Sequence, residues 1–174
     1  VASYPEASKD AVELINCAEI VMFRGKSLGK NTIQYFDTPI LDAFLHNVQM
    51  DNKLKEAVSN NHFMLKYQPQ FYTDSKELRG VEALIRWNDV AEDAVISPTV
   101  FIPMAEKNGT IVPIGKWVIE ESVRQCAEWH KKFNKPIIMS INVSAIQYMK
   151  EDFVEHLIAV IERYHVNPQG IELE

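Results

Sequence analysis

From residue 63 onward, short apolar runs alternate with longer segments whose apolar residues recur at helical spacing. The short runs are bounded by Pro, Gly or Asn and are typical of strands, whereas the periodic segments are typical of amphipathic helices. The predicted strands cover residues 63–70, 80–87, 136–143 and 170–174, and the predicted helices cover residues 98–107, 113–129 and 144–164. This alternation predicts an α/β fold with a parallel sheet under covering helices. Polar residues near the carboxyl ends of the strands indicate part of a (β/α)8 barrel, whose active sites gather at that rim.

The chain before residue 62 follows a different pattern. Residues 1–4 and 31–36 have the composition of short strands, on either side of a helix for which Ser8 is the expected N-cap. A strand, a helix and a strand cannot bury enough surface to be stable alone, so we expect the tail of a domain whose front is missing. Residues 37–61 have the pattern of a helical linker. A polar break at residues 51–53 predicts a hinge within it.

Composition and charge narrow the possible functions. The 174 residues are 47% hydrophobic and 24% charged, which is ordinary for a soluble globular protein. The net charge of −6 argues against a binder of nucleic-acid polymers, which usually carries a basic face. Cys17 and Cys126 lack metal-ligand spacing and fall at apolar helix positions, so we expect buried free thiols in a reducing cytoplasm. No run approaches the ~18–20 apolar residues of a membrane span. We therefore expect a cytoplasmic location, with any membrane tether in a missing N-terminal region.

The predicted strand Gly80–Trp87 carries two charged residues within an almost continuous apolar run. The period of two places Glu82 and Arg86 on the same face of this strand. A charge in a covered strand is costly unless it meets a partner, a metal ion or water in a cleft. One interpretation is a buried Glu82–Arg86 pair that fixes the strand register. The other is a site that handles an anion or a metal ion.

Three oxygen-bearing side chains lie on three successive predicted strands. Glu82, Asn142 and Glu174 are each flanked by apolar residues. Carboxylate and amide oxygens suit hard cations such as Mg²⁺ or Mn²⁺, so the sequence predicts a metal site built from these residues. The alternative is structural: Asn142 could cap a helix or close a turn, and Glu174 could belong to a fraying terminus.

Six short motifs occur in order along residues 62–174. They are Tyr67-Gln68-Pro69, Gly80-Val81-Glu82-Ala83-Leu84-Ile85-Arg86-Trp87, Phe101-Ile102-Pro103-Met104-Ala105-Glu106, Pro113-Ile114-Gly115, Ile141-Asn142-Val143-Ser144 and Glu172-Leu173-Glu174. In this order they resemble the N-terminal half of EAL domains, the cyclic di-GMP phosphodiesterases. The resemblance implies a (β/α)8 barrel of the TIM type whose first strand runs antiparallel to the rest, with a two-cation site at the strand ends.

The same resemblance implies roles for individual residues. Glu82, Asn142 and Glu174 match metal ligands of the family, and the expected cofactor is Mg²⁺ or Mn²⁺. Arg86 matches a contact to a substrate phosphate, and Gln68 matches an amide that positions the substrate. The implied reaction is the metal-dependent hydrolysis of the bacterial second messenger cyclic di-GMP to linear pGpG.

The first part of the chain carries a second resemblance. Its motifs are Ala2-Ser3-Tyr4-Pro5, Ala18-Glu19-Ile20-Val21-Met22-Phe23, Lys26 and Gly29-Lys30-Asn31. They resemble the C-terminal end of GGDEF (diguanylate cyclase) domains. In that family the lysine matching Lys26 contacts the nucleotide, but the cyclase signature loop is absent here. For Lys26 we favour a solvated side chain near a helix C-terminus. The expected organisation is a GGDEF remnant at residues 1–36, a linker at 37–61 and a truncated EAL half at 62–174.

The remaining ligands of the EAL family and its catalytic lysine lie downstream of the matched motifs, and none is present in these 174 residues. No catalytic residue is therefore expected here beyond the metal ligands, and we expect a piece of a longer GGDEF–EAL signalling protein that is inactive alone. Three functions remain open: the front half of a phosphodiesterase, a catalytically silent cyclic di-GMP receptor, and a regulatory module that forms a homodimer through the linker helix at residues 39–58.

Overall fold

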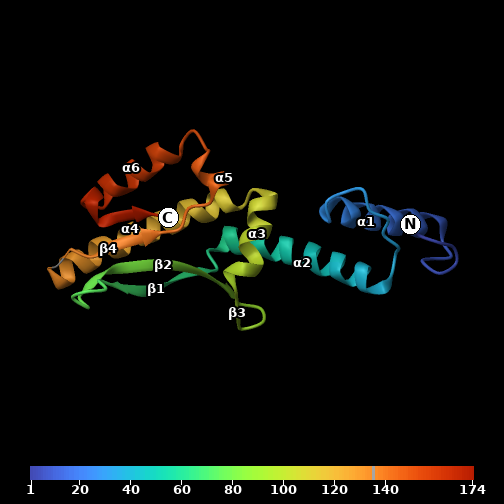
Figure 1. Cartoon of the computed structure of the whole chain (residues 1–174), viewed down its shortest axis with the longest axis horizontal. Coiled ribbons are helices and arrows are strands. Elements are labelled where there is room, and N and C mark those ends of the chain that lie inside the picture. The colour runs from blue at the N-terminus through green and yellow to red at the C-terminus, as the bar shows by residue number, and fades with distance from the viewer. Residues whose placement is uncertain (135) are drawn as a thin grey trace. The chain divides into compact units, whose positions relative to one another are not determined.

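The computed structural model describes residues 1–134 and 136–174, and the chain forms two compact units, Val1–Lys53 and Leu54–Glu174 (Figure 1). The first unit contains helix α1 (Ala11–Ser27) and most of helix α2 (Thr38–Asn60). The elements that follow α2 are β1 (Phe63–Phe71), β2 (Leu78–Asp89), β3 (Ala94–Ile96), α3 (Pro98–Asn108), α4 (Ile111–Phe133), β4 (Ile138–Ile141), α5 (Ala145–Tyr148), α6 (Phe153–Arg163), the 3-10 turn η1 (Pro168–Gly170) and β5 (Ile171–Leu173). No helix among the described residues is long and apolar enough to cross a membrane.

The second unit is built on an open mixed sheet with the strand order β1-β2-β4-β5, in which β3 pairs with β2. β1 and β2 are antiparallel, whereas β2, β4 and β5 are parallel to one another. The predicted α/β fold with an antiparallel first strand is therefore confirmed. Only Gly80–Ala83 of β2 pair with β4, so the β1–β2 hairpin continues beyond the carboxyl end of the parallel strands.

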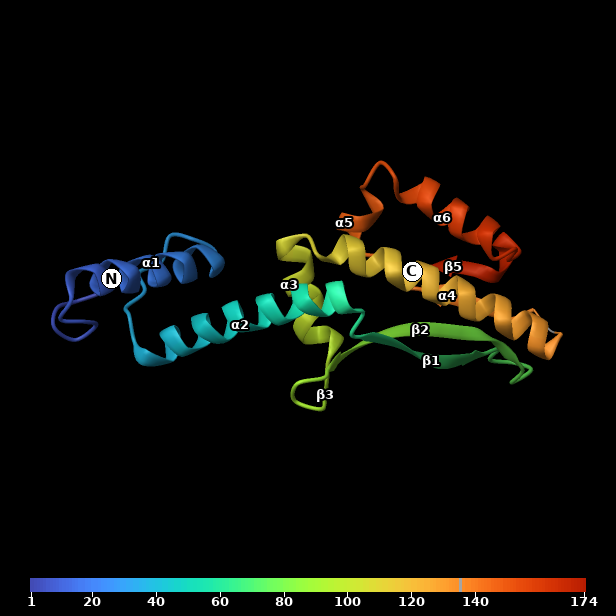
Figure 2. The same cartoon turned by 180° about the vertical axis from the view of Figure 1, so that it is seen from behind.

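One face of the sheet is covered by α4, which lies between the β1–β2 hairpin and α6 (Figures 1 and 2). From Val81 onward, the odd-numbered residues of β2 point to this covered face, and Val81, Ala83 and Trp87 are buried there. Tyr67, which pairs with Ala83, packs edge-on against Trp129 of α4 with 4.7 Å between ring centroids. Because side chains alternate along a strand, the even-numbered residues of β1 and β2 lie on the opposite face.

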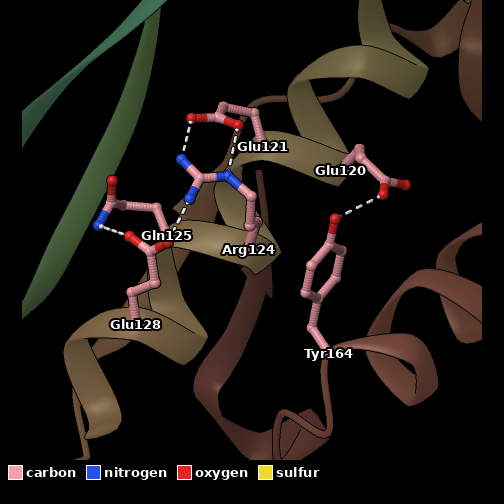
Figure 3. Close-up of polar contacts among 6 residues, drawn as sticks. All are labelled: Glu120, Glu121, Arg124, Gln125, Glu128 and Tyr164. Atoms are coloured by element: carbon pink, nitrogen blue, oxygen red, sulfur yellow. Dashed lines mark hydrogen bonds and ion pairs between the residues drawn. The ribbon is translucent and has the colours of Figure 1, made fainter. Parts of the chain in front are cut away.

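Polar side chains line both flanks of α4 (Figure 3). Arg124 lies between two carboxylates: its Nη2 is 2.6 Å from Oε1 of Glu121, and its Nη1 contacts Glu128. The hydrogen bond to Glu121 raises the pKa of the Arg124 guanidinium. On the other flank, the hydroxyl of Tyr164 donates to Oε1 of Glu120 at 2.8 Å. Such partly exposed pairs add little to stability. The Arg124 pairs lie within α4, whereas the contact between Tyr164 and Glu120 joins the end of α6 to α4.

Several helix ends differ from the sequence prediction. The N-cap of α1 is Asp10, whose side chain accepts hydrogen bonds from the backbone of Val12 and Glu13, and not Ser8. Ser8 instead donates its hydroxyl to Glu13 at 2.7 Å. Ser and Asp can both cap a helix, but only Asp10 lies directly before the first turn of α1 and reaches the free N–H groups of that turn. Helix α4 continues past the predicted end at Trp129 and closes at Phe133.

The two strands predicted in the first unit are wrong, because residues 1–4 and 31–36 form no strand in the structure. They are joined by a hydrogen bond from Phe36 N to Val1 O at 2.8 Å and by one from the Val1 amino group to Gln34 O at 2.6 Å. Two short segments without a neighbouring strand cannot extend a ladder. Helix α2 is continuous through the polar stretch at residues 51–53, and the boundary between the two compact units lies directly after it, between Lys53 and Leu54.

Both cysteines are free and buried, as predicted. Cys126 lies in α4, its Sγ 3.7 Å from the carbonyl oxygen of Ile137, and burial raises the pKa of its thiol to about 11. A rise of two units above the ordinary value of 9.0 lowers the thiolate fraction at pH 8 about a hundredfold. We expect iodoacetamide to leave Cys126 unmodified in the native protein and to label it in urea, as read by mass spectrometry of the peptides. Rapid native labelling of Cys126 would contradict this packing.

Candidate functional site

Glu82 and Asn142 meet at the carboxyl end of two parallel strands. Glu82 is in register with Ser140 of β4, and Asn142 follows the last residue of that strand. The amide Nδ2 of Asn142 donates to Oε1 of Glu82 at 2.6 Å. This contact joins two of the three predicted metal ligands across sixty residues of sequence.

Glu174 follows the last residue of β5, and its backbone is joined to the segment that carries Asn142. Glu174 N donates to the carbonyl of Ile141 at 3.0 Å, and Val143 N donates to the carbonyl of Glu174 at 2.9 Å. Its carboxylate is turned toward β1, where Oε1 accepts a long hydrogen bond of 3.5 Å from the Gln70 amide. All three predicted ligands therefore lie at the ends of adjacent strands, with one direct side-chain contact, between Asn142 and Glu82.

Gln68 and Arg86 lie on the same face of the β1–β2 hairpin as Glu82. Gln68 is directly opposite Glu82 in the antiparallel ladder, and Arg86 is opposite Met64, farther along the extended part of the hairpin. Arg86 is half-buried and donates from Nη1 to the carbonyl oxygen of Ile85 at 2.8 Å. In the part of the chain that the structure describes, Glu82 and Arg86 form no ion pair, so the interpretation as a buried Glu–Arg pair is not supported.

This set of atoms fits a hard divalent cation. Two carboxylates and one amide lie near the carboxyl ends of the paired parts of β2, β4 and β5, and oxygen ligands of these types suit Mg²⁺ or Mn²⁺. Asn142 turns its Nδ2 toward Glu82, which leaves Oδ1 as the amide atom able to bind a cation. Across residues 1–134 and 136–174, no group of three or more His, Cys, Asp or Glu side chains could hold a metal ion.

The segment that carries Asn142 is held by a contact that the sequence analysis missed. The hydroxyl of Ser144 donates to Oε1 of Glu106 in α3 at 2.6 Å, and Ser144 Oγ also accepts from Ile146 N at the start of α5. Ser144 and Gln147 have the spacing of a capping box, but the side chain of Gln147 does not reach back to Ser144. Its side chain is buried against Gly115 of α4, where there is no Cβ to exclude it. Helices α3 and α4 therefore both position the loop after β4.

The model of the EAL domain family matches residues 51–174. Signaling protein YkoW of Bacillus subtilis (strain 168) is 33% identical over 175 residues, an alignment that covers 100% of this chain and 22% of YkoW. The bifunctional diguanylate cyclase/cyclic di-GMP phosphodiesterase MucR of Pseudomonas aeruginosa is 30% identical over 174 residues, covering 100% of this chain and 25% of MucR.

Solved structures of EAL proteins share the fold. The PaMucR phosphodiesterase in complex with c-di-GMP superposes with a TM-score of 0.68 at 32% identity, over 72% of this chain and 50% of that chain. The EAL enzyme Bd1971 with cAMP and cyclic-di-GMP bound gives a TM-score of 0.69 at 28% identity, over 95% of this chain and 43% of that chain.

The chain spans a quarter or less of the length of these two curated relatives and half or less of the two solved chains. Within that span, the family match covers most of the chain and includes the sheet, with its antiparallel first pair, and the Glu82–Asn142 contact. On this evidence, the chain belongs to the EAL domain family.

Proposed function

We propose that this chain supplies the metal- and substrate-binding front half of a cyclic di-GMP phosphodiesterase, which hydrolyses the dinucleotide to pGpG. The observation that carries the proposal is the Glu82–Asn142 contact at the strand ends, with Gln68 opposite Glu82 and Arg86 on the same face. The MucR structure to which the chain is similar is described as a phosphodiesterase in complex with c-di-GMP, which supports the choice of substrate.

Each residue contributes a distinct function. Glu82, Asn142 and Glu174 hold Mg²⁺ or Mn²⁺, whose bound form activates water and stabilises the leaving oxygen in phosphodiester cleavage. Arg86 presents a planar guanidinium that suits a phosphate better than a lysine would. Gln68 orients the dinucleotide beside Glu82. Without cations the carboxylates repel the anionic diester, so binding of metal and substrate is coupled.

We also propose that the open sheet is the first half of a (β/α)8 barrel, completed by further strands that bring the remaining ligands. The fraction of each solved EAL chain that is matched supports this proposal. In this organisation, residues 62–174 are the front half of the EAL domain and residues 37–61 are a linker. The same proposal assigns residues 1–36 to a GGDEF remnant, on the motifs that resemble the C-terminal end of GGDEF domains. In this proposal, hydrolysis of cyclic di-GMP needs the ligands that the further strands bring.

A homodimer through α2 is a further part of this proposal. Phe44, Leu45 and Val48 are exposed on one side of this helix. Exposed apolar residues at helical spacing favour a partner helix. Sedimentation of the protein with and without residues 39–58 tests this; a monomer in both cases rules the homodimer out.

The decisive test uses the longest natural polypeptide that contains residues 1–174, called here the parent polypeptide. We expect it to convert cyclic di-GMP to pGpG with Mg²⁺ or Mn²⁺, as followed by liquid chromatography, and to lose this activity with EDTA. Binding of cyclic di-GMP without product formation would instead assign the protein as a receptor. If the parent polypeptide neither binds nor hydrolyses cyclic di-GMP, both assignments are contradicted and the regulatory module remains.

Arg86→Met should lower kcat/KM for cyclic di-GMP and leave the fold intact. The substitution removes the positive fork but keeps an unbranched apolar stem, and charge-assisted contacts to a phosphate contribute about 1.5–3 kcal/mol. We expect kcat/KM to fall by about tenfold to a hundredfold. Arg86→Lys should recover only part of this loss because lysine lacks the fork. An unchanged kcat/KM in Arg86→Met would remove Arg86 from the site.

A further inference from the structure

A bulge in the β1–β2 hairpin places Arg79 outside the regular ladder. Gln70 is paired with Gly80, whereas the next residue, Phe71, is paired with Leu78, so Arg79 has no opposite residue. An extra residue of this kind changes the direction of its side chain. Regular alternation would direct Arg79 to the same face as Val81, which is the face covered by α4. Its guanidinium instead reaches the face of the sheet that carries Glu82.

On that face, Arg79 joins the first and last strands of the sheet. Its Nη1 donates to Oε1 of Gln70 at 2.9 Å, and its Nη2 donates to Oε2 of Glu172 at 2.5 Å. Between them lies Ser140 of β4, which is fully buried and whose Oγ is 3.4 Å from both Gln70 Oε1 and Glu172 Oε2. These residues form a polar layer next to the carboxyl ends of the strands, where the proposed metal ligands lie. Ser140 is two residues before Asn142, and Glu172 is two residues before Glu174.

The layer reaches the proposed metal site through Gln70. Because Arg79 and Ser140 occupy Oε1 of the Gln70 amide, its Nε2 is turned toward Glu174, and the two groups lie 3.5 Å apart. We propose that Arg79 and Gln70 are positioning residues for Glu174: Arg79 fixes the orientation of the Gln70 amide, which in turn restrains the ligand carboxylate. This inference rests on the proposed function, in which Glu174 binds a cation.

A purely structural role for Arg79 makes a different prediction. The side chains of Arg79 and Glu172 are 30% and 40% exposed, and an ion pair this accessible to water contributes little to stability. Groups that orient a metal ligand, in contrast, typically change metal affinity by about tenfold to a hundredfold when they are removed. The two roles therefore separate when stability and metal affinity are measured on the same variants.

The experiment measures Mn²⁺ affinity by electron paramagnetic resonance, and thermal stability by circular dichroism, in the parent polypeptide. We expect Gln70→Leu and Arg79→Met each to bind Mn²⁺ about tenfold more weakly, at the lower end of that range because the contact to Glu174 is long. Arg79→Lys should restore part of the affinity, since lysine can contact only one of the two partners. Arg163→Met is the matched control, because Arg163 forms a comparable exposed pair with Glu120 at 2.8 Å, away from Glu174.

The outcomes are distinct. Weaker Mn²⁺ binding by Gln70→Leu and Arg79→Met, with melting temperatures equal to that of Arg163→Met, supports the positioning role. Wild-type affinity in both variants overturns it, as does a loss of affinity that is accompanied by a lower melting temperature than the control has. If the unsubstituted protein binds no Mn²⁺, the proposed function itself fails, and the role of Arg79 fails with it.

Discussion

Glu82→Gln is expected to reduce metal-dependent hydrolysis of cyclic di-GMP by the parent polypeptide about a thousandfold. The substitution keeps the shape of the side chain but replaces an anionic ligand by a neutral amide. Metal-ion stabilisation of a phosphodiester transition state is worth several kcal/mol, and about 4 kcal/mol corresponds to this factor. Asn142→Ala should have a similar effect, because it removes both the amide ligand and its hydrogen bond to Glu82.

The fold should survive both substitutions. Asn142 is exposed and Glu82 is half-buried, and loss of one hydrogen bond between them costs about 1 kcal/mol. Glu120→Gln is the matched control, since Glu120 is also half-buried and hydrogen-bonded, but to Tyr164 on the far side of α4. Rates are measured as pGpG formed per unit time, and folding by circular dichroism. Wild-type rates from Glu82→Gln or Asn142→Ala would remove these residues from the metal site.

Gly80→Ala is expected to lower the free energy of unfolding by about 2–3 kcal/mol, at the upper end of the range for overpacked sites. A Cβ at this position would lie 2.3 Å from the carbonyl oxygen of Ile138 and 3.0 Å from its carbonyl carbon. These are backbone atoms of β4 and cannot rotate away, so the two strands would have to separate. Because Glu82 and Asn142 depend on the same pairing, Mn²⁺ affinity should fall as well.

Urea denaturation followed by tryptophan fluorescence measures this effect as a lower midpoint with little change in slope. Gly25→Ala serves as the control, because its Cβ would meet no atom closer than 3.8 Å and alanine is the better helix former. Because all three tryptophans lie in the second unit, that variant should leave the midpoint of the fluorescence transition unchanged. An unchanged midpoint in Gly80→Ala would show that β2 and β4 are less closely packed than the structure indicates.

The sequence alone determined most element types of the second unit and much of the candidate site, whereas the two strands predicted in the first unit are wrong. The apolar period of α4 placed Ile119, Val123, Cys126 and Ala127 on one face; the first three are buried and Ala127 is half-buried. The period of two placed Glu82 and Arg86 on one face, and the alternation of strands with helices brought Asn142 near Glu82 at the strand ends. Local patterns suffice here because each depends only on backbone periodicity and on the common direction of parallel strands.

Tertiary structure decided the features that depend on distant partners. The bulge that brings Arg79 to Gln70 and Glu172 cannot be predicted from the sequence pattern. One unpaired residue changes the face of the sheet that its side chain reaches, but it does not change the composition of the strand. Likewise, Gln147 packs on Gly115 instead of completing a capping box, because the glycine leaves space on α4. Periodicity specifies which face a residue occupies, but which atoms meet across that face is decided only when strands and helices from distant parts of the chain pack together.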